Sequence, residues 1–389
     1  MNRRDFLTSA TATTLLAPQR VLGANDRIRI GLIGTGGRCM YLARIVKDLP
    51  GAEIVAACDV YEPRRLDAAE KMGPQAQPVA DYREVLDRKD IDAVVIGAPD
   101  HWHAAMTLDA VAAGKDVYVE KPVTHELSEG EKLIAGVEKS GRIVATGTQQ
   151  RSWDHYILAK QIVESGRLGQ ITLVQCYWYQ NYLRRPRPDQ EIDVSRLDWD
   201  RWLGPARKQP FDPVRFRRWR FFWDFGGGIF TDLMIHWIDV IQWIMNSPSP
   251  KSVQAFGATH AVKTLECPDT VNAAILFPNN YTVVYYGTMV GSLEGGGIIF
   301  RGSDGMMKLT RDGFAVYREG QIPPENTAMP EPSILAKSTG DGTISNLKNW
   351  VECMRSHAIP NAHIRAGVEA ARTSHLANQA MRSGKMICG

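Results

Sequence analysis

Between residues 27 and 148, short apolar runs alternate with stretches in which apolar and polar positions follow a helical period. The apolar runs predict buried strands, which we place at 27–33, 53–58, 91–97, 117–119 and 143–146. The intervening stretches predict helices, placed at 40–47, 82–87, 104–113 and 129–140. Ser128 and Glu131 have the spacing of a capping box before the last helix. Alternation of strand and helix predicts an α/β domain over 27–148, with a doubly wound parallel sheet of the Rossmann type.

Residues 149–389 follow a different pattern. Alternating apolar and polar positions predict strands at 172–179, 252–257, 271–277 and 281–288. Helical periodicity predicts helices at 154–165, 229–245, 347–355 and 365–382, and the Pro-, Ser- and Gly-rich stretch 321–342 predicts a long loop. We expect an α+β domain with a largely antiparallel open sheet, so that the 389 residues form two domains.

Composition excludes several classes of protein. The net charge of +3 is too small to indicate nucleic-acid binding. The six cysteines form no CxxC pair, so neither a zinc ribbon nor a disulfide framework is expected. No apolar run reaches the ~18 residues that indicate a membrane-spanning helix.

The N-terminus has the pattern of an export signal. Arg3 and Arg4 precede Asp5-Phe6-Leu7, which is a twin-arginine pattern, and a small, mildly apolar stretch follows at 8–17. The alternative is an arm that merely contains two arginines. We interpret 1–26 as a Tat-type signal peptide and expect a periplasmic or exported protein without stable membrane insertion, or a cytoplasmic one if the signal does not function.

A glycine turn follows the first predicted strand. Gly34 permits a tight turn, and Gly36 lets a pyrophosphate approach the backbone at a helix N-terminus. Gly37 and Arg38 complete the candidate phosphate-binding turn, although Cys39 replaces the third glycine of the dinucleotide fingerprint. The second strand ends in Asp59, placed to bond the ribose of NAD. Arg64 and Arg65 follow it and leave NADP open.

The next strand ends bring further polar residues to the same edge of the sheet, where ligands bind in open parallel sheets. Lys121 follows one strand, and Pro122 restricts it and permits a cis bond between the two. On these residues alone, a solvated charged pair at a strand end is as good an interpretation of Glu120 and Lys121 as a catalytic role. His101 and His103 have no third ligand nearby, so we predict a polar lining or a cap rather than a metal site.

The second domain carries a cluster of aromatic and arginine residues. The stretch 215–220 alternates arginine with aromatic residues, and no nucleic-acid motif accompanies it. Aromatic faces and arginines suit a sugar, although loop packing explains several of them equally well. The candidate substrate contacts are Arg151, Tyr179, Tyr182 and Trp219.

Asp232 and His236 lie four residues apart in the helix predicted at 229–245. On an α-helix this spacing puts both side chains on one face, where a carboxylate orients an imidazole for proton transfer. Such a pair is by itself more often structural than catalytic. Asp239 is read as a surface or supporting acid.

In order and spacing, four features resemble the Gfo/Idh/MocA oxidoreductases: the glycine turn, Asp59, Ala98-Pro99-Asp100-x-x-His103 and Glu120-Lys121-Pro122. The resemblance implies that Lys121 bridges substrate and nicotinamide, and that Glu120, Pro99 and His103 shape the nicotinamide end of the cleft. It also places Asp232 and His236 opposite the nicotinamide. One face of the second sheet is a dimer surface in this family, which implies a homo-oligomer, either a dimer or a tetramer.

The expected function is an oxidoreductase that transfers hydride between a sugar or polyol and NAD, with Lys121, Asp232 and His236 as catalytic residues. Export implies a tightly held cofactor that is regenerated within each cycle. One alternative is a redox-neutral, NAD-dependent glycosidase on the same fold. Another is a sugar-binding protein without catalysis.

Overall fold

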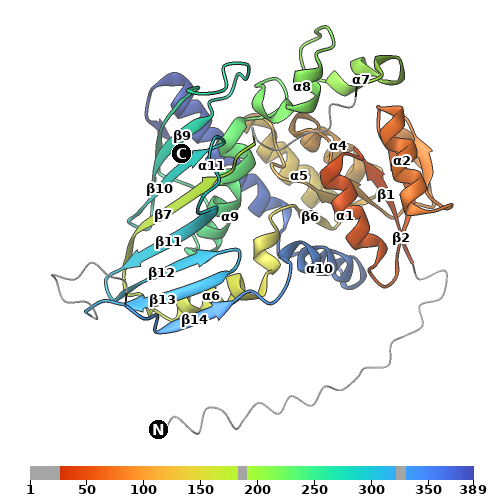
Figure 1. Cartoon of the computed structure of the whole chain (residues 1–389). Helices are drawn as coiled ribbons and strands as arrows, with labels where there is room; N and C mark the ends of the chain where they lie inside the picture. The colour runs from red at the N-terminus through yellow and green to blue at the C-terminus, as the bar shows by residue number, and fades with distance from the viewer. Residues whose placement is uncertain (1–26, 183–190, 321–329) are drawn as a thin grey trace, which may run out of the picture.

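The computed structural model describes residues 27–182, 191–320 and 330–389 (Figure 1). The twin-arginine pattern and the rest of the segment 1–26 lie outside these residues, as do 321–329 of the predicted loop.

A six-stranded parallel sheet forms the centre of the first domain, in the order β3-β2-β1-β4-β5-β6. Its strands are β1 (Ile28–Ile33), β2 (Ala52–Cys58), β3 (Gln77–Val79), β4 (Ala93–Ile96), β5 (Asp116–Val119) and β6 (Val144–Thr146). The predicted doubly wound fold is confirmed. Strand β3 escaped prediction because it has only three residues, two of them exposed, and contains a proline.

Helices cover both faces of this sheet: α1 (Gly37–Lys47), α2 (Glu62–Met72), α3 (Tyr82–Asp87), α4 (Asp100–Ala112) and α5 (Gly130–Ser140). Helix α4 begins directly after Pro99, four residues before the predicted start, so His101 and His103 lie in its first turns. The predicted capping box is wrong by two residues. Glu126 and Glu129 form it instead, around the 3₁₀ turn that precedes α5.

The second domain contains a nine-stranded sheet in the order β14-β13-β12-β11-β7-β10-β9-β8-β15. Its strands are β7 (Ile171–Tyr179), β8 (Ser252–Ala258), β9 (Thr270–Phe277), β10 (Tyr281–Thr288), β11 (Gly296–Gly302), β12 (Gly305–Thr310), β13 (Gly313–Arg318), β14 (Ile334–Lys337) and β15 (Ile387–Cys388). Every neighbouring pair is antiparallel except β7 and β10, so the predicted sheet type is confirmed. The sequence pattern did not predict the strands from β11 onward.

The remaining helices are α6 (Asp154–Glu164), α7 (Trp199–Leu203), α8 (Pro213–Arg217), α9 (Ile235–Ile244), α10 (Gly342–Ser356) and α11 (Ile364–Ser383). Helices α6 and α9 pack on one face of the second sheet, and the other face carries partly or fully exposed side chains. The helix predicted at 229–245 is divided, because Phe230–Met234 form a π-helical turn before α9.

The two C-terminal helices pack against both domains. Trp350 of α10 lies in one hydrophobic cluster with Ile30 of β1, and Figure 1 shows α10 beside α1. Val368 of α11 packs with the other face of the first sheet, and Leu376 of the same helix packs with the core of the second domain. Helix α11 therefore joins the two hydrophobic cores. No helix within the described ranges is both long and apolar enough to cross a membrane.

Candidate active site

A cleft of about 710 Å³ lies at the carboxyl ends of β1, β2, β4 and β5 and is closed on its other side by the second domain. Most of the predicted site residues line it: Gly34, Gly36, Gly37, Arg38, Asp59, Arg64, Pro99, His103, Glu120, Lys121, Tyr182, Trp219, Asp232 and His236. Two predicted substrate residues do not. Arg151 is buried against Asp239, with 2.7 Å between Nε and Oδ1, and Tyr179 packs against Tyr177 and Tyr286 on the open face of the sheet.

The glycine turn leaves space where a dinucleotide phosphate would lie. Gly34 has a φ of 77°, and a Cβ there would approach the backbone nitrogen of Ala98 to 2.6 Å. In contrast, apart from the adjoining residues and the backbone of α1 itself, no protein atom lies within 4 Å of the positions that a Cβ would take at Gly36 and Gly37. This open cradle at the N-terminus of α1 fits the pyrophosphate of NAD.

In the dinucleotide fingerprint, the third glycine allows the helix to pack closely on the strand. Here a glycine that follows the neighbouring strand β4 allows this close packing instead. A Cβ added at Gly97, just after β4, would lie 2.7 Å from the Cβ of Cys39. The missing side chain at Gly97 therefore makes room for Cys39 in α1. The substitution of cysteine for the third glycine does not disturb the turn.

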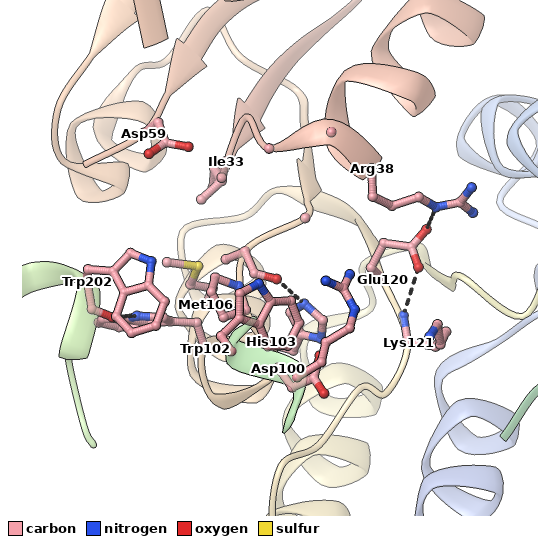
Figure 2. Close-up of a pocket in the computed structure, with 18 of the residues that line it drawn as sticks. Ile33, Arg38, Asp59, Asp100, Trp102, His103, Met106, Glu120, Lys121 and Trp202 are labelled. Atoms are coloured by element: carbon pink, nitrogen blue, oxygen red, sulfur yellow. Dashed lines mark hydrogen bonds and ion pairs between the residues drawn. The ribbon is translucent and has the colours of Figure 1, made fainter. Parts of the chain in front are cut away.

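Asp59 directly follows β2 and is buried at the adenosine end of the cleft (Figure 2). Its Oδ1 accepts a hydrogen bond from the backbone N–H of Tyr61 at 2.9 Å. Burial raises the pKa of this carboxyl, against the positive charge of Arg64, which lowers it. The Arg64 guanidinium itself packs over the ring of Phe216 at 4.8 Å. An acid in this position is suited to a ribose hydroxyl.

Glu120 links the phosphate cradle to Lys121 (Figure 2). Its Oε1 lies 2.7 Å from Nε of Arg38, and its Oε2 accepts from the backbone N–H of Lys121 at 3.2 Å. Burial alone would lower the pKa of Arg38, but the carboxylate of Glu120 outweighs it, so the pKa lies above its usual value. The Lys121–Pro122 bond is cis.

His103 braces the same segment from α4. Its Nδ1 lies 2.6 Å from the carbonyl oxygen of Pro122, and its Nε2 lies 2.8 Å from that of Ala98. Both ring nitrogens are thus engaged by the backbone, and the side chain is buried. Across the described part of the chain, no group of three or more His, Cys, Asp or Glu residues is arranged to hold a metal ion.

Asp232 is the centre of the polar network between the domains. Lys121 Nζ donates to its Oδ1 at 2.8 Å and to its backbone oxygen at 2.6 Å. Arg220 Nε also donates to Oδ1, at 3.2 Å, and the Tyr182 hydroxyl donates to Oδ2 at 2.6 Å. Burial would raise the pKa of Asp232, but the charges of Lys121 and Arg220 outweigh it and hold the pKa well below its usual value. The carboxylate therefore stays ionised.

His236 also lines the cleft, but the expected contact with Asp232 is absent from the described network. The prediction assumed an α-helix, whereas Asp232 lies in the π-helical turn, where four residues no longer complete a turn. The imidazole instead packs near the ring of Trp178, 5.5 Å between centroids, and its buried Nδ1 has no described hydrogen-bond partner. Burial and the nearby charges of Lys121 and Arg311 lower the pKa of His236 well below its usual value.

Several charged residues that were not predicted as site residues also line the cleft, among them Asp100, Arg220 and Arg311. Asp100 follows Pro99 directly, and burial raises its pKa well above the usual value. Arg220 belongs to the arginine–aromatic stretch but did not stand out within it. Arg311 lies in the turn between β12 and β13, two strands that the sequence pattern did not predict, so no signal in the sequence pointed to it.

Comparison with known proteins agrees with this arrangement. Residues 28–148 match the model of an oxidoreductase family with an NAD-binding Rossmann fold (GFO_IDH_MocA), and residues 160–388 match that family's C-terminal alpha/beta domain. Inositol 2-dehydrogenase of Salmonella typhimurium (strain LT2) is 29% identical over 181 residues, covering 45% of this chain and 53% of the relative. A 1-carboxy-3-chloro-3,4-dihydroxycyclohexa-1,5-diene dehydrogenase of Comamonas testosteroni is 27% identical over 216 residues, covering 55% and 47%. The chain thus spans about half the length of these curated relatives.

Solved structures show the same fold over almost the whole chain. The WlbA dehydrogenase of Bordetella pertussis, in complex with NADH and UDP-GlcNAcA, has a TM-score of 0.73 at 22% identity, covering 93% of this chain and 99% of its own. A levoglucosan dehydrogenase in complex with NADH and levoglucosan has a TM-score of 0.73 at 19% identity, with the same coverage. Together with the matches to both family domains, the cleft and its glycine turn show that the chain belongs to the Gfo/Idh/MocA family of NAD-binding oxidoreductases.

Proposed function

We propose that this protein transfers hydride between a hydroxyl-bearing carbon of a sugar or polyol and NAD. The observation that carries the proposal is the placement of Lys121 and His236 at one end of the NAD-type cleft, with Lys121 fixed by Asp232. The names of relatives support a polyhydroxylated substrate, since they include inositol and levoglucosan. They also include a carboxylated ring, so the family does not choose between neutral and acidic substrates.

Lys121 is suited to hold the reacting oxygen. An ammonium group has three donors, and Asp232 takes up two of them. The third is left for the hydroxyl oxygen of the substrate, where it stabilises the negative charge that develops as the proton leaves.

His236 is suited to take that proton. Its lowered pKa keeps the imidazole neutral at pH 7, so it acts as a base. The nicotinamide, when bound, supplies the acceptor for the hydride. Asp232 is a positioning residue for Lys121 in this scheme rather than the partner of His236, which revises the expected arrangement of the three residues.

The test is turnover of a panel of sugars and polyols, followed by nicotinamide absorbance. Lys121→Ala should lower kcat/KM by about 100- to 1,000-fold, the range for loss of one donor to a developing oxyanion. Lys132→Ala removes the same type of side chain from an exposed position on α5 and is the matched control. Near-normal turnover by Lys121→Ala would show that the assignment is wrong.

We further propose that the protein is exported by the twin-arginine route and keeps its nucleotide bound through a closed redox cycle. Arg3, Arg4 and the small-residue stretch after them support export. The experiment is to purify the protein with its own N-terminus from the periplasm, quench it in acid and measure the released nucleotide per chain. About one NAD per chain supports the closed cycle, whereas an empty protein that binds NAD reversibly points to an ordinary dehydrogenase.

The same preparation separates the two alternative functions. Release of the sugar from a glycoside without net NADH would identify a redox-neutral glycosidase. Sugar binding without any change in nicotinamide absorbance would identify a non-catalytic sugar-binding protein.

We also propose a homo-oligomer formed through the open face of the nine-stranded sheet. The strand register places Phe256, Asn272, Tyr286 and Tyr177 in one row across β8, β9, β10 and β7 on that face. Phe256 is 63% exposed, and Leu335 on the same face is 65% exposed. Exposed apolar side chains gathered on one face support an interface between subunits.

A further inference from the structure

Arg311 differs from two other arginines around the catalytic end of the cleft in that no described carboxylate pairs with it. Arg38 pairs with Glu120, and Arg220 pairs with Asp232. Arg311 lines the cleft as well, yet it forms no hydrogen bond or ion pair with any residue that the structure describes. Its Nε atom is buried and has no partner.

An unpaired, largely buried guanidinium is costly for a folded protein. Burial of a charge without a partner is unfavourable, and so is a buried donor that forms no hydrogen bond. Burial accordingly lowers the pKa of Arg311. The guanidinium lies over the ring of Trp178 at 4.6 Å, which offsets part of this cost but satisfies no N–H group. An arginine that lines a cleft and has no paired carboxylate is a candidate for binding an anionic group of a ligand.

The position of Arg311 points to the substrate rather than to the nucleotide. The ring of Trp178 contacts both the Arg311 guanidinium and the imidazole of His236, so the two groups lie near one another. The phosphate cradle at Gly36 and Gly37 belongs to α1 in the other domain. An anion on Arg311 would therefore be carried by the molecule that reacts beside His236.

We propose that Arg311 binds a carboxylate of the substrate, so that the enzyme acts on an acidic sugar such as a uronic or aldonic acid. The inference rests on the proposed function. A planar guanidinium matches a planar carboxylate through two parallel hydrogen bonds. The single positive charge of Arg311 also balances one carboxylate, whereas a phosphate monoester carries a larger charge.

The experiment is calorimetric titration of the NADH-bound protein with sugars that differ at one carbon. The probes are glucuronic acid, galacturonic acid and gluconic acid, with glucose and galactose as neutral parents and glucose 6-phosphate as the phosphate analogue. At least one acid should bind about 10-fold or more tightly than its neutral parent, as expected for hydrogen bonds to a charged group. If no acid binds more tightly, or if glucose 6-phosphate binds more tightly than every acid, the carboxylate site is overturned.

Two variants separate the role of Arg311 from a general loss of charge. Arg311→Gln should weaken binding of the preferred acid by about 10- to 100-fold, while the Kd of the neutral parent and of NADH stays within about twofold. Lys132→Gln removes a positive charge from an exposed position on α5, outside the cleft lining, and should change none of these values. Equal weakening of the acid and its neutral parent by Arg311→Gln would contradict the proposal.

Thermal unfolding distinguishes a binding role from a structural one. Because Arg311 has no described partner, Arg311→Gln should leave Tm unchanged or raise it, whereas loss of a structural contact would lower it. If the protein bound no NADH, the proposed function would fail. Titration of the nucleotide-free protein with acid and neutral sugars would still report on Arg311 alone.

Discussion

Asp232 receives three side-chain donors and one of them is the lysine expected to act on the substrate. Lys121, Arg220 and Tyr182 each donate to its carboxylate, whose pKa is held low by the two cations. A long lysine side chain alone loses considerable rotamer entropy when it is ordered, so a fixed anion is an efficient way to hold it. Asp232 thus sets where the free donor of Lys121 points.

Asp232→Asn tests this role. The amide keeps the shape but loses the charge, so Lys121 is held less firmly and Arg220 is left without its counter-ion. We expect kcat to fall by about 100-fold, with the Kd of NADH within about twofold of wild type. Tyr182→Phe, which removes one donor and leaves both cations in place, should lower kcat less. Steady-state kinetics and NADH fluorescence titration measure the two effects, and an unchanged kcat in Asp232→Asn would refute the role.

The pKa of His236 predicts the acid side of the pH profile. Burial, Lys121 and Arg311 all lower it, so the imidazole is neutral at pH 7 and gains a proton only below the usual value of about 6.5. With a neutral sugar as substrate, kcat/KM should therefore be level near pH 7 and decline on acidification below that value.

Removal of the positive charge of Arg311 should move the pH at which kcat/KM declines. Arg311→Gln leaves His236 with less positive charge nearby, which raises its pKa and shifts the acid limb of kcat/KM to higher pH. Lys132→Gln serves as the control, because its exposed side chain does not line the cleft, and its profile should overlay that of wild type. If the acid limb stays in place in Arg311→Gln, His236 is not the group that titrates.

At the scale of elements, contiguous motifs were predictable and contacts between distant elements were not. Lys121 and Asp59 could be placed at the cleft because each lies within two residues of the end of a short, mostly apolar strand. The relation of Asp232 to His236 was mistaken because a π-helical turn has no distinct hydrophobic period. Arg311 could be placed only once β12 and β13 were known, because it lies in the turn between them. Both strands begin at a glycine, and their sequences alternate only weakly between apolar and polar residues, so neither strand was predicted.

The glycine turn offers a test of how α1 packs on the sheet. Gly97→Ala adds a methyl group at a point 2.7 Å from the Cβ of Cys39, which pushes α1 away from β4. Such overpacking costs about 1–3 kcal/mol, so we expect a lower Tm and about 10-fold weaker NADH binding. The double variant Cys39→Gly with Gly97→Ala moves the glycine back to the helix and should recover most of the affinity. Additive losses in the double variant would mean that the two positions do not share this contact.

At the scale of the whole molecule, the chain returns to its first domain after forming all but the last strand of the second sheet. Helix α10 packs with β1, and α11 contributes to the cores of both domains. Local patterns correctly predicted the type of each sheet, but amphipathic helices near the C-terminus do not reveal which sheet they cover. Local patterns also do not show which face of the sheet Tyr179 occupies, because the alternation over residues 172–179 is compatible with either face.

The open sheet face gives the prediction that concerns assembly. Phe256→Asp places a charge on the exposed row of β8, and it should not disturb the monomer, because the side chain is already 63% exposed. If this face joins subunits, a buried unpaired carboxylate would be strongly unfavourable, so the variant should sediment as a smaller species than wild type. Ile359→Asp, at a residue that is 79% exposed between α10 and α11 and away from the sheet, is the matched control and should sediment as wild type does. Sedimentation velocity measures both, and a wild-type protein that is monomeric, or a Phe256→Asp protein of unchanged size, would place the subunit interface elsewhere or show that none forms.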